Sequence, residues 1–123
     1  GLSFDLSADD VRIRFDEARL VQVLHNLVSN AINHGQPGTV ITVSAAYQAM
    51  RCRISIRNIG ATIPPEELGR IWERFHQAGS RPLGTGLGLA IVKSILEQHQ
   101  ANFGVQSQNG ITEFWFDAPV AEV

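Results

Sequence analysis

A run of apolar residues at intervals of three and four constrains the fold of this chain more than any other feature. The spacing is that of one buried helix face, because an α-helix turns once every 3.6 residues. Asp16 precedes the run and is a typical helix cap, and the polar, glycine-containing stretch 34–38 ends it. We therefore expect one long helix lying against a hydrophobic layer that the rest of the chain supplies. The apolar residues are Leu20, Val23, Leu24, Leu27, Val28 and Ala31.

Alternating apolar and polar residues elsewhere in the chain predict β-strands. Asn109-Gly110 lies between the last two alternating segments and is a strong signal for a hairpin turn. Two helical segments separate the strands: a short one over 66–75, and a long one from about Gly86 to Gln98. The resulting order predicts an α+β fold, with a layer of helices over a mostly antiparallel sheet. The expected strands cover residues 2–6, 11–15, 39–47, 51–57, 102–108 and 111–119.

Length and composition fit one globular domain covering residues 1–123. The chain is 44% hydrophobic and carries a net charge of -2, so no basic field points to nucleic acid. Its first ten residues do not have the pattern of a signal peptide, and its apolar runs are too short to span a bilayer. Cys52 is the sole cysteine, which excludes an internal disulfide and a cysteine-based metal site.

A polar stripe follows the apolar face of the first long helix. Asn26 and Asn30 lie one turn apart on the same side, and Gln22 and Asn33 extend the stripe. Asparagine is a mediocre helix former, so its repeated use needs a reason. A solvated face is one reading. The other is a row of amide oxygens facing a ligand, and such oxygens suit Mg²⁺ that is also held by phosphates. His25 projects away from the stripe, and we interpret it as a surface or packing residue.

Two further segments are candidates for ligand contacts. Glycines at 84, 86 and 88 open the second long helix, where free backbone N–H groups and a positive dipole end favour phosphate. The spacing matches neither a Rossmann fingerprint nor a Walker A loop, and a hinge before a helix is the alternative reading. The segment Asn58–Pro65 leaves the end of a strand and could bind a base. Taken alone, it is better explained as an ordinary strand-to-helix turn.

Taken together and in this order, these segments resemble the catalytic domain of sensor histidine kinases. That domain belongs to the wider superfamily that includes gyrase, the ninety-kilodalton chaperone and the mismatch-repair ATPase. The resemblance covers roughly residues 16–119. Asn26–Ala31 is similar to the asparagine box, residues 72–75 are similar to the phenylalanine box, and residues 84–92 closely match the second glycine box.

The resemblance implies a fold and a set of site residues. The fold would be a two-layer sandwich, a mixed five-stranded sheet covered on one face by three helices. Asn30 would coordinate Mg²⁺, Asn26 would support the metal-triphosphate end, and Arg74 would approach the phosphates. Residues 76–85 would form a lid over ATP, with Phe75 plugging its base and His76 as a plausible phosphate contact. The nucleotide-contacting residues would be Asn26, Asn30, Asn33, His34, Asn58, Gly60, Thr62, Ile63, Phe75, Arg81, Thr85, Gly86, Leu87, Gly88 and Leu89.

Several positions depart from the family pattern. Asn58 stands where an aspartate usually contacts adenine, and Thr62 replaces the second glycine of the same motif. Asn33 stands where many members have a lysine that could contact phosphate. The pair of glycines that is typical around 99–101 is missing. Since some members use asparagine at the adenine, we do not infer a loss of nucleotide binding from Asn58.

The residue at position 26 separates the possible activities. Gyrase- and chaperone-type ATPases have a glutamate there, which acts as general base on water, whereas the amide of Asn26 cannot take up a proton. We therefore expect a kinase domain that transfers the γ-phosphoryl of Mg-ATP to a histidine on a separate dimerisation domain. The alternatives are a degenerate nucleotide-sensing domain and an ATPase of the gyrase type.

The same resemblance implies partners and a location. The expected partners are ATP and ADP, the kinase's own dimerisation domain and a response regulator receiver domain, with no nucleic acid. We expect a monomeric fragment of a dimeric kinase, forming the cytoplasmic portion of a membrane-anchored receptor without touching the membrane itself.

Overall fold

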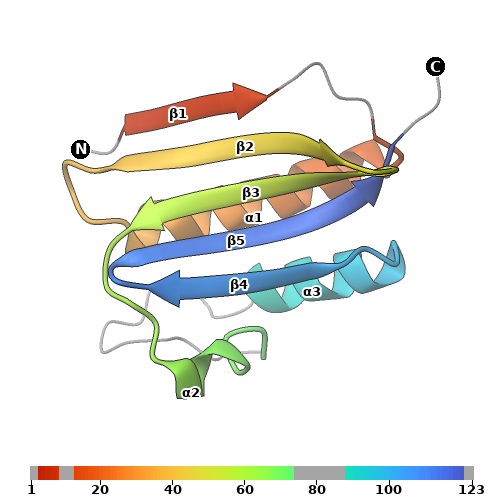
Figure 1. Ribbon diagram of the computed structural model, residues 1–123. Coiled ribbons are helices and arrows are strands. Elements are labelled where there is room, and N and C mark those ends of the chain that lie inside the picture. Colours follow the sequence, from red (N-terminus) through yellow and green to blue (C-terminus); the bar gives the residue numbers. More distant parts are fainter. Residues whose placement is uncertain (1–2, 9–12, 74–87, 121–123) are drawn as a thin grey trace.

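The computed structural model describes residues 3–8, 13–73 and 88–120, and of residues 3–8 it describes only the backbone (Figure 1). Strands and helices together form an α+β arrangement, as the sequence predicts. The elements are β1 (Ser3–Ala8), α1 (Glu17–His34), β2 (Val40–Gln48), β3 (Arg51–Ile59), α2 (Pro65–Leu68), α3 (Gly88–Gln98), β4 (Phe103–Gln108) and β5 (Ile111–Pro119).

The strands form one sheet in the order β1-β2-β3-β5-β4. Strands β2, β3, β5 and β4 pair in antiparallel fashion, whereas β1 runs parallel to β2. Helices α1 and α3 lie on the same face of this sheet (Figure 1). The opposite face of β3, β5 and β4 carries no described helix.

The core fills the space between the sheet and the two helices. On β3 every second residue points into it, so Cys52, Ile54 and Ile56 are buried while Arg51, Arg53 and Arg57 lie on the other face. This is the two-residue alternation expected of a strand with one covered face. The helices and β5 complete the core with Val23, Leu27, Ala31, Val92, Ile95, Leu96, Phe114 and Phe116.

Contacts at the N-terminal end of α1 align it with α3. Asp16 caps α1 by accepting a hydrogen bond from the backbone N–H of Arg19 at 3.0 Å. The ring of His99, just beyond the end of α3, stacks on Phe15 with centroids 3.9 Å apart, and its Nδ1 lies 2.8 Å from the carbonyl oxygen of Ile95. The end of α3 therefore lies beside the start of α1, and the two helices run antiparallel.

Three local predictions from the sequence are wrong. The strand expected over 11–15 is reduced, within the described residues, to a single bridge between Ile13 and Val120. The short helix ends at Leu68, where Gly69 follows, and the backbone continues in turns as far as Glu73. Strand β3 extends to Ile59, so Asn58 lies in the sheet and not in a loop.

The backbone after α3 has a conformation that favours glycine, although the glycine pair typical of the family is missing there. Gln100 adopts a φ of 53°, the left-handed conformation that glycine takes without strain. No described helix is long and apolar enough to cross a membrane.

A polar cluster fastens the strands at the end of the sheet opposite Asn58. The carboxylate of Asp117 on β5 accepts a hydrogen bond from Nη2 of Arg51 on β3 at 2.8 Å. It also accepts bonds from the backbone N–H and the side-chain amide of Asn102, at 2.8 and 2.9 Å. Burial alone would raise the pKa of Asp117, but the bonds from Arg51 and Asn102 and the charge of Arg51 hold it below the ordinary carboxyl value.

We predict that Asp117→Asn destabilises the domain by about 1.5–3 kcal/mol, because it removes charge-assisted bonds from a mostly buried carboxylate. Glu113→Gln is the matched control. Its partner Arg57 keeps 52% of its side chain exposed, so we expect a loss under about 1 kcal/mol. The measurement is urea unfolding at pH 7. Equal losses in the two variants would contradict the prediction. Since the pKa of Asp117 is lowered by folding, its contribution is present above the ordinary carboxyl pKa and is lost as the pH falls through the lowered value.

Candidate functional site

The asparagine stripe of α1 meets the first residue of α3. Asn26 and Asn30 are partly exposed on α1, and the side-chain amide of Asn26 donates to the carbonyl oxygen of Gly88 across 3.4 Å. A distance of 3.4 Å is long for a hydrogen bond, so this contact contributes little stability. It does show that the two groups lie next to each other. The contact brings together two segments that are 62 residues apart in the sequence. Asn33 lies exposed in the last turn of α1.

The start of α3 has open space at Gly88. Within the described residues, and apart from its chain neighbours and its own helix backbone, no atom lies within 4 Å of a Cβ built on this residue, so packing against this part of the chain does not require glycine. The free N–H groups of a helix start are a ready anion site. Leu89, the next residue, is partly buried and packs against the core. Gly88 therefore leaves an accessible helix start directly beside Asn26.

Gly60 joins the end of β3 to the end of α1. Gly60 forms an isolated bridge with Gly35, and the backbone N–H of Gln36 donates to the carbonyl oxygen of Ile59 at 2.7 Å. A Cβ on Gly60 would lie only 2.3 Å from the carbonyl oxygen of His34. Since that neighbour is backbone, only glycine fits. The close approach fixes the C-terminal end of α1 against the sheet.

Asn58 is a polar residue at the end of an otherwise apolar row. It follows Ile54 and Ile56 on the core face of β3, is 2% exposed, and lies opposite Thr112 of β5. An amide in this position needs a polar partner, because burying an unbonded polar group is costly. Its side chain lies beside Gly60, so it stands at the junction of β3 and the loop that follows.

That loop is attached to the β4–β5 hairpin. The hydroxyl oxygen of Thr62 accepts from the backbone N–H of Gly110 at 2.7 Å, and the N–H of Ile63 donates to the hydroxyl of Ser107 at 2.8 Å. Ser107 in turn bonds Thr112 at 2.7 Å. The predicted contacts Thr62 and Ile63 are thus held in place by the hairpin end.

Sequence reasoning missed Ser107 and Thr112. A signal for the pair was present, because a two-residue Asn109-Gly110 turn fixes the register of the hairpin. That register sets Gln108 opposite Ile111 and Ser107 opposite Thr112.

Histidines in this region differ in their surroundings. His34 lies in the last turn of α1, and partial burial of its imidazole lowers its pKa below the ordinary value, although the residue as a whole remains exposed. At neutral pH it is therefore an uncharged donor and acceptor and not a cation. His25 is exposed, in agreement with its interpretation as a surface residue.

The remaining predicted site residues lie outside the described residues. These are Arg74, Phe75, His76, Arg81, Thr85, Gly86 and Leu87, together with the expected lid. Of the segment that resembles the phenylalanine box, Trp72 and Glu73 are described. The Trp72 ring packs edge-on against Phe103 and Phe114, with centroids 5.1 and 5.5 Å away.

Acidic, histidine and cysteine side chains do not form a metal centre in the part of the chain that the structure describes: no group of three or more is close enough to hold an ion. The oxygen donors beside the open start of α3 are neutral amides. Such donors fit a hard cation whose other ligands are phosphate oxygens and water, and they fit a soft metal poorly.

The end of α1 meets the end of β3 at Gly60, and the middle of α1 meets the start of α3 through Asn26 and Gly88. A family model described as histidine kinase-, DNA gyrase B- and HSP90-like ATPase matches residues 15–122. The chain belongs to this ATPase family. Its relatives include the sensor protein IrlS of Burkholderia pseudomallei, to which it is 39% identical over 112 residues. The chain is therefore a histidine kinase ATPase domain, as the motifs predicted.

Solved structures agree with this assignment. The mycobacterial sensor histidine kinase MprB superposes with a TM-score of 0.88 at 27% identity, covering 99% of this chain and 86% of that one. Full-length ShkA in complex with AMPPNP gives a TM-score of 0.85 at 31% identity, covering 100% of this chain and 26% of that one. The match to IrlS covers 87% of this chain but only 24% of the relative, so the chain spans about a quarter of that sensor protein.

We predict that Gly60→Ala destabilises the domain by about 1–3 kcal/mol, the usual cost of forcing an extra carbon into a packed site. Gly69→Ala is the control, because a Cβ at Gly69 has no packing partner within 4 Å in the described part of the chain and its backbone is helical. Urea unfolding of both variants measures the difference. If Gly60→Ala were as stable as Gly69→Ala, the close approach to His34 would not constrain the fold.

Proposed function

We propose that this domain binds Mg-ATP between α1, α3 and the end of β3, and transfers the γ-phosphoryl to a histidine on a separate dimerisation domain. The observation that carries the proposal is the contact between Asn26 and Gly88, which sets the asparagine stripe beside an open helix start. Phosphate oxygens and a hard cation are the two ligands that such an arrangement suits.

Asn30 is the metal-binding residue of the proposal, and Asn26 supports the metal-triphosphate end. Both are partly exposed and lie one turn apart on α1. Bound Mg²⁺ would neutralise charge on the phosphates. The residues of the chain align the nucleotide: Asn30 through its amide oxygen, and Gly88 through its backbone N–H. Arg74, Arg81 and residues 85–87 complete the proposed phosphate contacts.

Asn58, Gly60, Thr62 and Ile63 form the proposed adenine end. The amide oxygen of the buried Asn58 can accept a hydrogen bond from the exocyclic amine of adenine. Gly60 lies next to that amide and fixes the end of β3 against α1, while Thr62 and Ile63 are held against the hairpin by the bonds described above. Asn33, His34, Leu89 and Phe75 are proposed to line the remainder of the site.

The chemistry at position 26 favours transfer over hydrolysis. Attack by water on the γ-phosphate is helped by a base, which contributes roughly 10²–10⁴ in rate. The amide of Asn26 can orient water but cannot accept its proton. A neutral imidazole needs less help, because its attacking nitrogen carries a lone pair and no proton that must be removed. The site is thus suited to a histidine nucleophile held in line with the phosphates.

The proposed partners follow from the same reaction. The phosphorylated histidine would lie on the kinase's own dimerisation domain, and a receiver domain would take the phosphoryl group from it. The kinase would act as a dimer with this domain on the cytoplasmic side of the membrane. A nucleotide-sensing domain without transfer is the second candidate, favoured by Asn58 and Asn33, which depart from the family pattern.

We predict that Gly88→Ala weakens ATP binding about tenfold or more without destabilising the fold. A methyl group there would occupy the space that the proposal assigns to phosphate, and it has no packing partner within 4 Å among the described residues. Alanine also favours a helix over glycine by up to about 1 kcal/mol. Calorimetry with an ATP analogue gives the affinity, urea unfolding gives the stability, and Gly69→Ala is the control. Unchanged ATP affinity would place the phosphates elsewhere.

We further predict slow phosphate release by the isolated domain, together with transfer of radiolabel from ATP to a histidine-bearing dimerisation domain supplied separately. Asn30→Ala should abolish most of the Mg²⁺-dependent transfer. Gln22→Ala is the matched control, since its amide oxygen is already engaged by Arg19 at 2.9 Å and it lies outside the proposed site.

Three results would contradict this proposal in different ways. Rapid phosphate release would assign the domain to the ATPase branch of the family. Bound ATP without transfer to any such histidine would favour the nucleotide-sensing candidate. Equal transfer by Asn30→Ala and Gln22→Ala would remove Asn30 from the metal site.

A further inference from the structure

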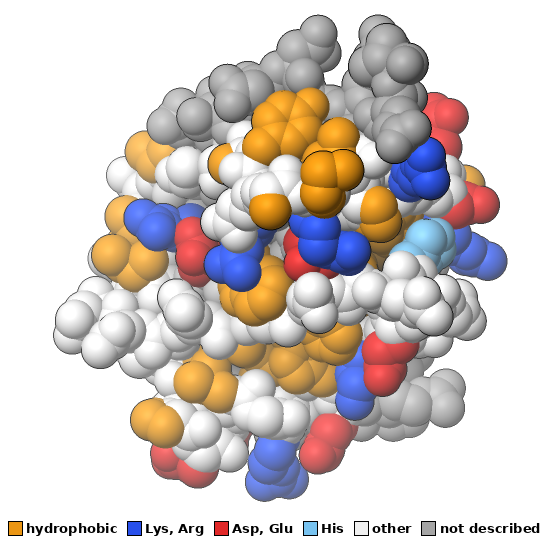
Figure 2. Space-filling model, turned by 45° about the vertical axis from the view of Figure 1, so that its right-hand side comes forward, with side chains coloured by type: hydrophobic (Ala, Val, Ile, Leu, Met, Phe, Trp, Pro, Cys, Tyr) orange, Lys and Arg blue, Asp and Glu red, His pale blue; other side chains and the backbone are white. Residues whose placement is uncertain are grey.

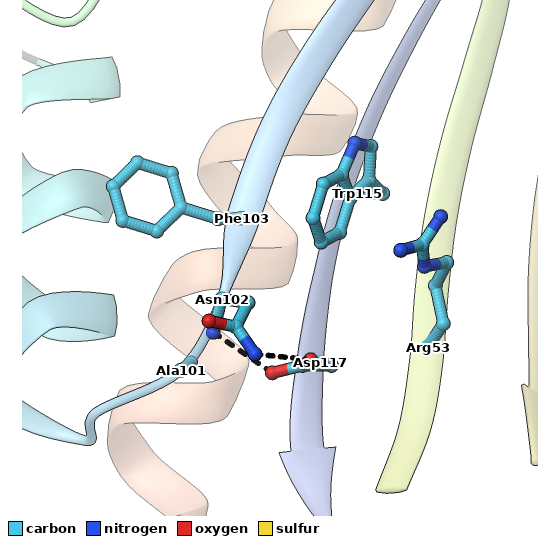
Figure 3. A pocket seen from close by; sticks show the side chains of 6 residues that line it. All are labelled: Arg53, Ala101, Asn102, Phe103, Trp115 and Asp117. Atoms are coloured by element: carbon cyan, nitrogen blue, oxygen red, sulfur yellow. Dashed lines mark hydrogen bonds between the residues drawn. The ribbon is translucent and has the colours of Figure 1, made fainter. Parts of the chain in front are cut away.

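A hollow lies on the face of the sheet opposite α1 and α3. Its volume is about 520 Å³, and Figure 3 shows it between β3, β5 and the start of β4, with α1 behind the sheet. It shares no residue with the proposed nucleotide site. The lining residues are Arg53, Ala101, Asn102, Phe103, Trp115 and Asp117.

Gly104 and Trp115 shape this hollow. A Cβ on Gly104 would lie 2.9 Å from Cζ2 and Nε1 of Trp115, so the indole rests where the side chain of residue 104 would otherwise stand. The indole forms an apolar wall on the solvent-facing side of β5, and its ring remains partly exposed. The indole thus places a large apolar surface on a sheet face over which no described helix lies, with its N–H as a polar group at the edge.

Arg53 is the cation at the edge of the hollow, and within the described residues it has no acidic partner. Its guanidinium lies over the Trp115 ring, 3.9 Å from the centroid (Figure 3). Its Nε is buried and has no hydrogen-bond partner in the part of the chain that the structure describes. The two other arginines of β3 on this face are paired, Arg51 with Asp117 and Arg57 with Glu113.

The carboxylate of Asp117 does not form an ion pair with Arg53. Asp117 lies directly opposite it in the strand register, yet its oxygens are occupied by Arg51 and Asn102. Stacking on an aromatic ring orients a guanidinium and leaves its N–H edge free to donate. Within the described residues, the hollow therefore offers the oriented, unpaired fork of terminal N–H groups of Arg53 beside an apolar wall, while the buried Nε faces away from solvent.

A carboxylate is the group that fits this fork best, because it accepts two parallel N–H bonds from a planar guanidinium. An extended polyanion fits poorly, since Lys, Arg, Asp and Glu side chains are intermixed on this side of the molecule (Figure 2) and the net charge is -2. The apolar ring of Trp115 next to the fork suits an apolar side chain that neighbours the carboxylate.

We propose that this hollow, which we call the Arg53–Trp115 pocket, is a docking site for a partner protein that presents a glutamate or aspartate next to an apolar residue in an extended segment. The carboxylate binds the Arg53 guanidinium, and the apolar side chain packs on Trp115. The site lies on the outer sheet face and operates independently of nucleotide binding.

The test uses two short peptides, acetyl-Leu-Glu-Leu-amide and acetyl-Leu-Gln-Leu-amide, which differ only in charge and one amide group. They are titrated into the isotopically labelled domain while the Arg53 Nε–H and Trp115 indole N–H signals are followed by NMR. We expect both signals to move with the glutamate peptide and its affinity to be about tenfold higher than that of the glutamine peptide, as for a charge-assisted bond.

Variants separate the pocket from the rest of the face. Arg53→Gln should remove the preference for glutamate and Arg53→Lys should reduce it, because lysine keeps the charge but loses the fork. Arg57→Gln, on the same strand and face, should keep the preference. ATP affinity should be unchanged in all three, which separates this test from that of the nucleotide site.

Two outcomes would overturn the proposal. Equal affinities for the two peptides, or an equal loss in Arg53→Gln and Arg57→Gln, would show that no specific carboxylate site exists. Movement of the same two signals when the domain alone is concentrated, with no peptide present, would assign the pocket to a second copy of this chain.

Discussion

The close approach between Gly60 and the carbonyl oxygen of His34 fixes the geometry on which the rest of the structure depends. It holds the C-terminal end of α1 against the end of β3, while His99 and Phe15 hold the N-terminal end beside α3. A helix secured at both ends cannot slide along the sheet. The position of Asn26 relative to Gly88 therefore follows from contacts that do not involve either residue.

Much of the fold could be predicted from periodicity, because burial acts directly on residue spacing. The apolar stripe of α1 gave the correct element and the correct buried face, and the alternation along β3 gave the correct element. Ends of elements were less predictable. Helix α2 ends at Leu68, although the apolar residues Ile71 and Trp72 continue the pattern, because those side chains pack into the core from turns. Only tertiary contacts decide between these two ways of burying them.

The candidate site was predictable to a different degree at each position. The motif residues could be named from their order along the chain, and the structure brings Asn26 close to Gly88 and Asn58 close to Gly60. The second role of Gly60 was not visible in the sequence, since the residue that excludes a side chain there is a backbone carbonyl 26 positions earlier. At Thr62 the family pattern has glycine instead. The threonine hydroxyl accepts a hydrogen bond from the hairpin, which glycine could not do.

The hairpin between β4 and β5 has a consequence for how this domain can vary. Both turn residues, Asn109 and Gly110, have positive φ, and the tight turn places the N–H and carbonyl of Gly110 within reach of Thr62 and Gly60. Exposed turns of this kind usually accept insertions freely. Here one added residue would shift Ser107 and Gly110 out of register with the loop after β3. A turn at the surface thus behaves as part of the site's framework, and its length should vary far less among related domains than its exposure would suggest.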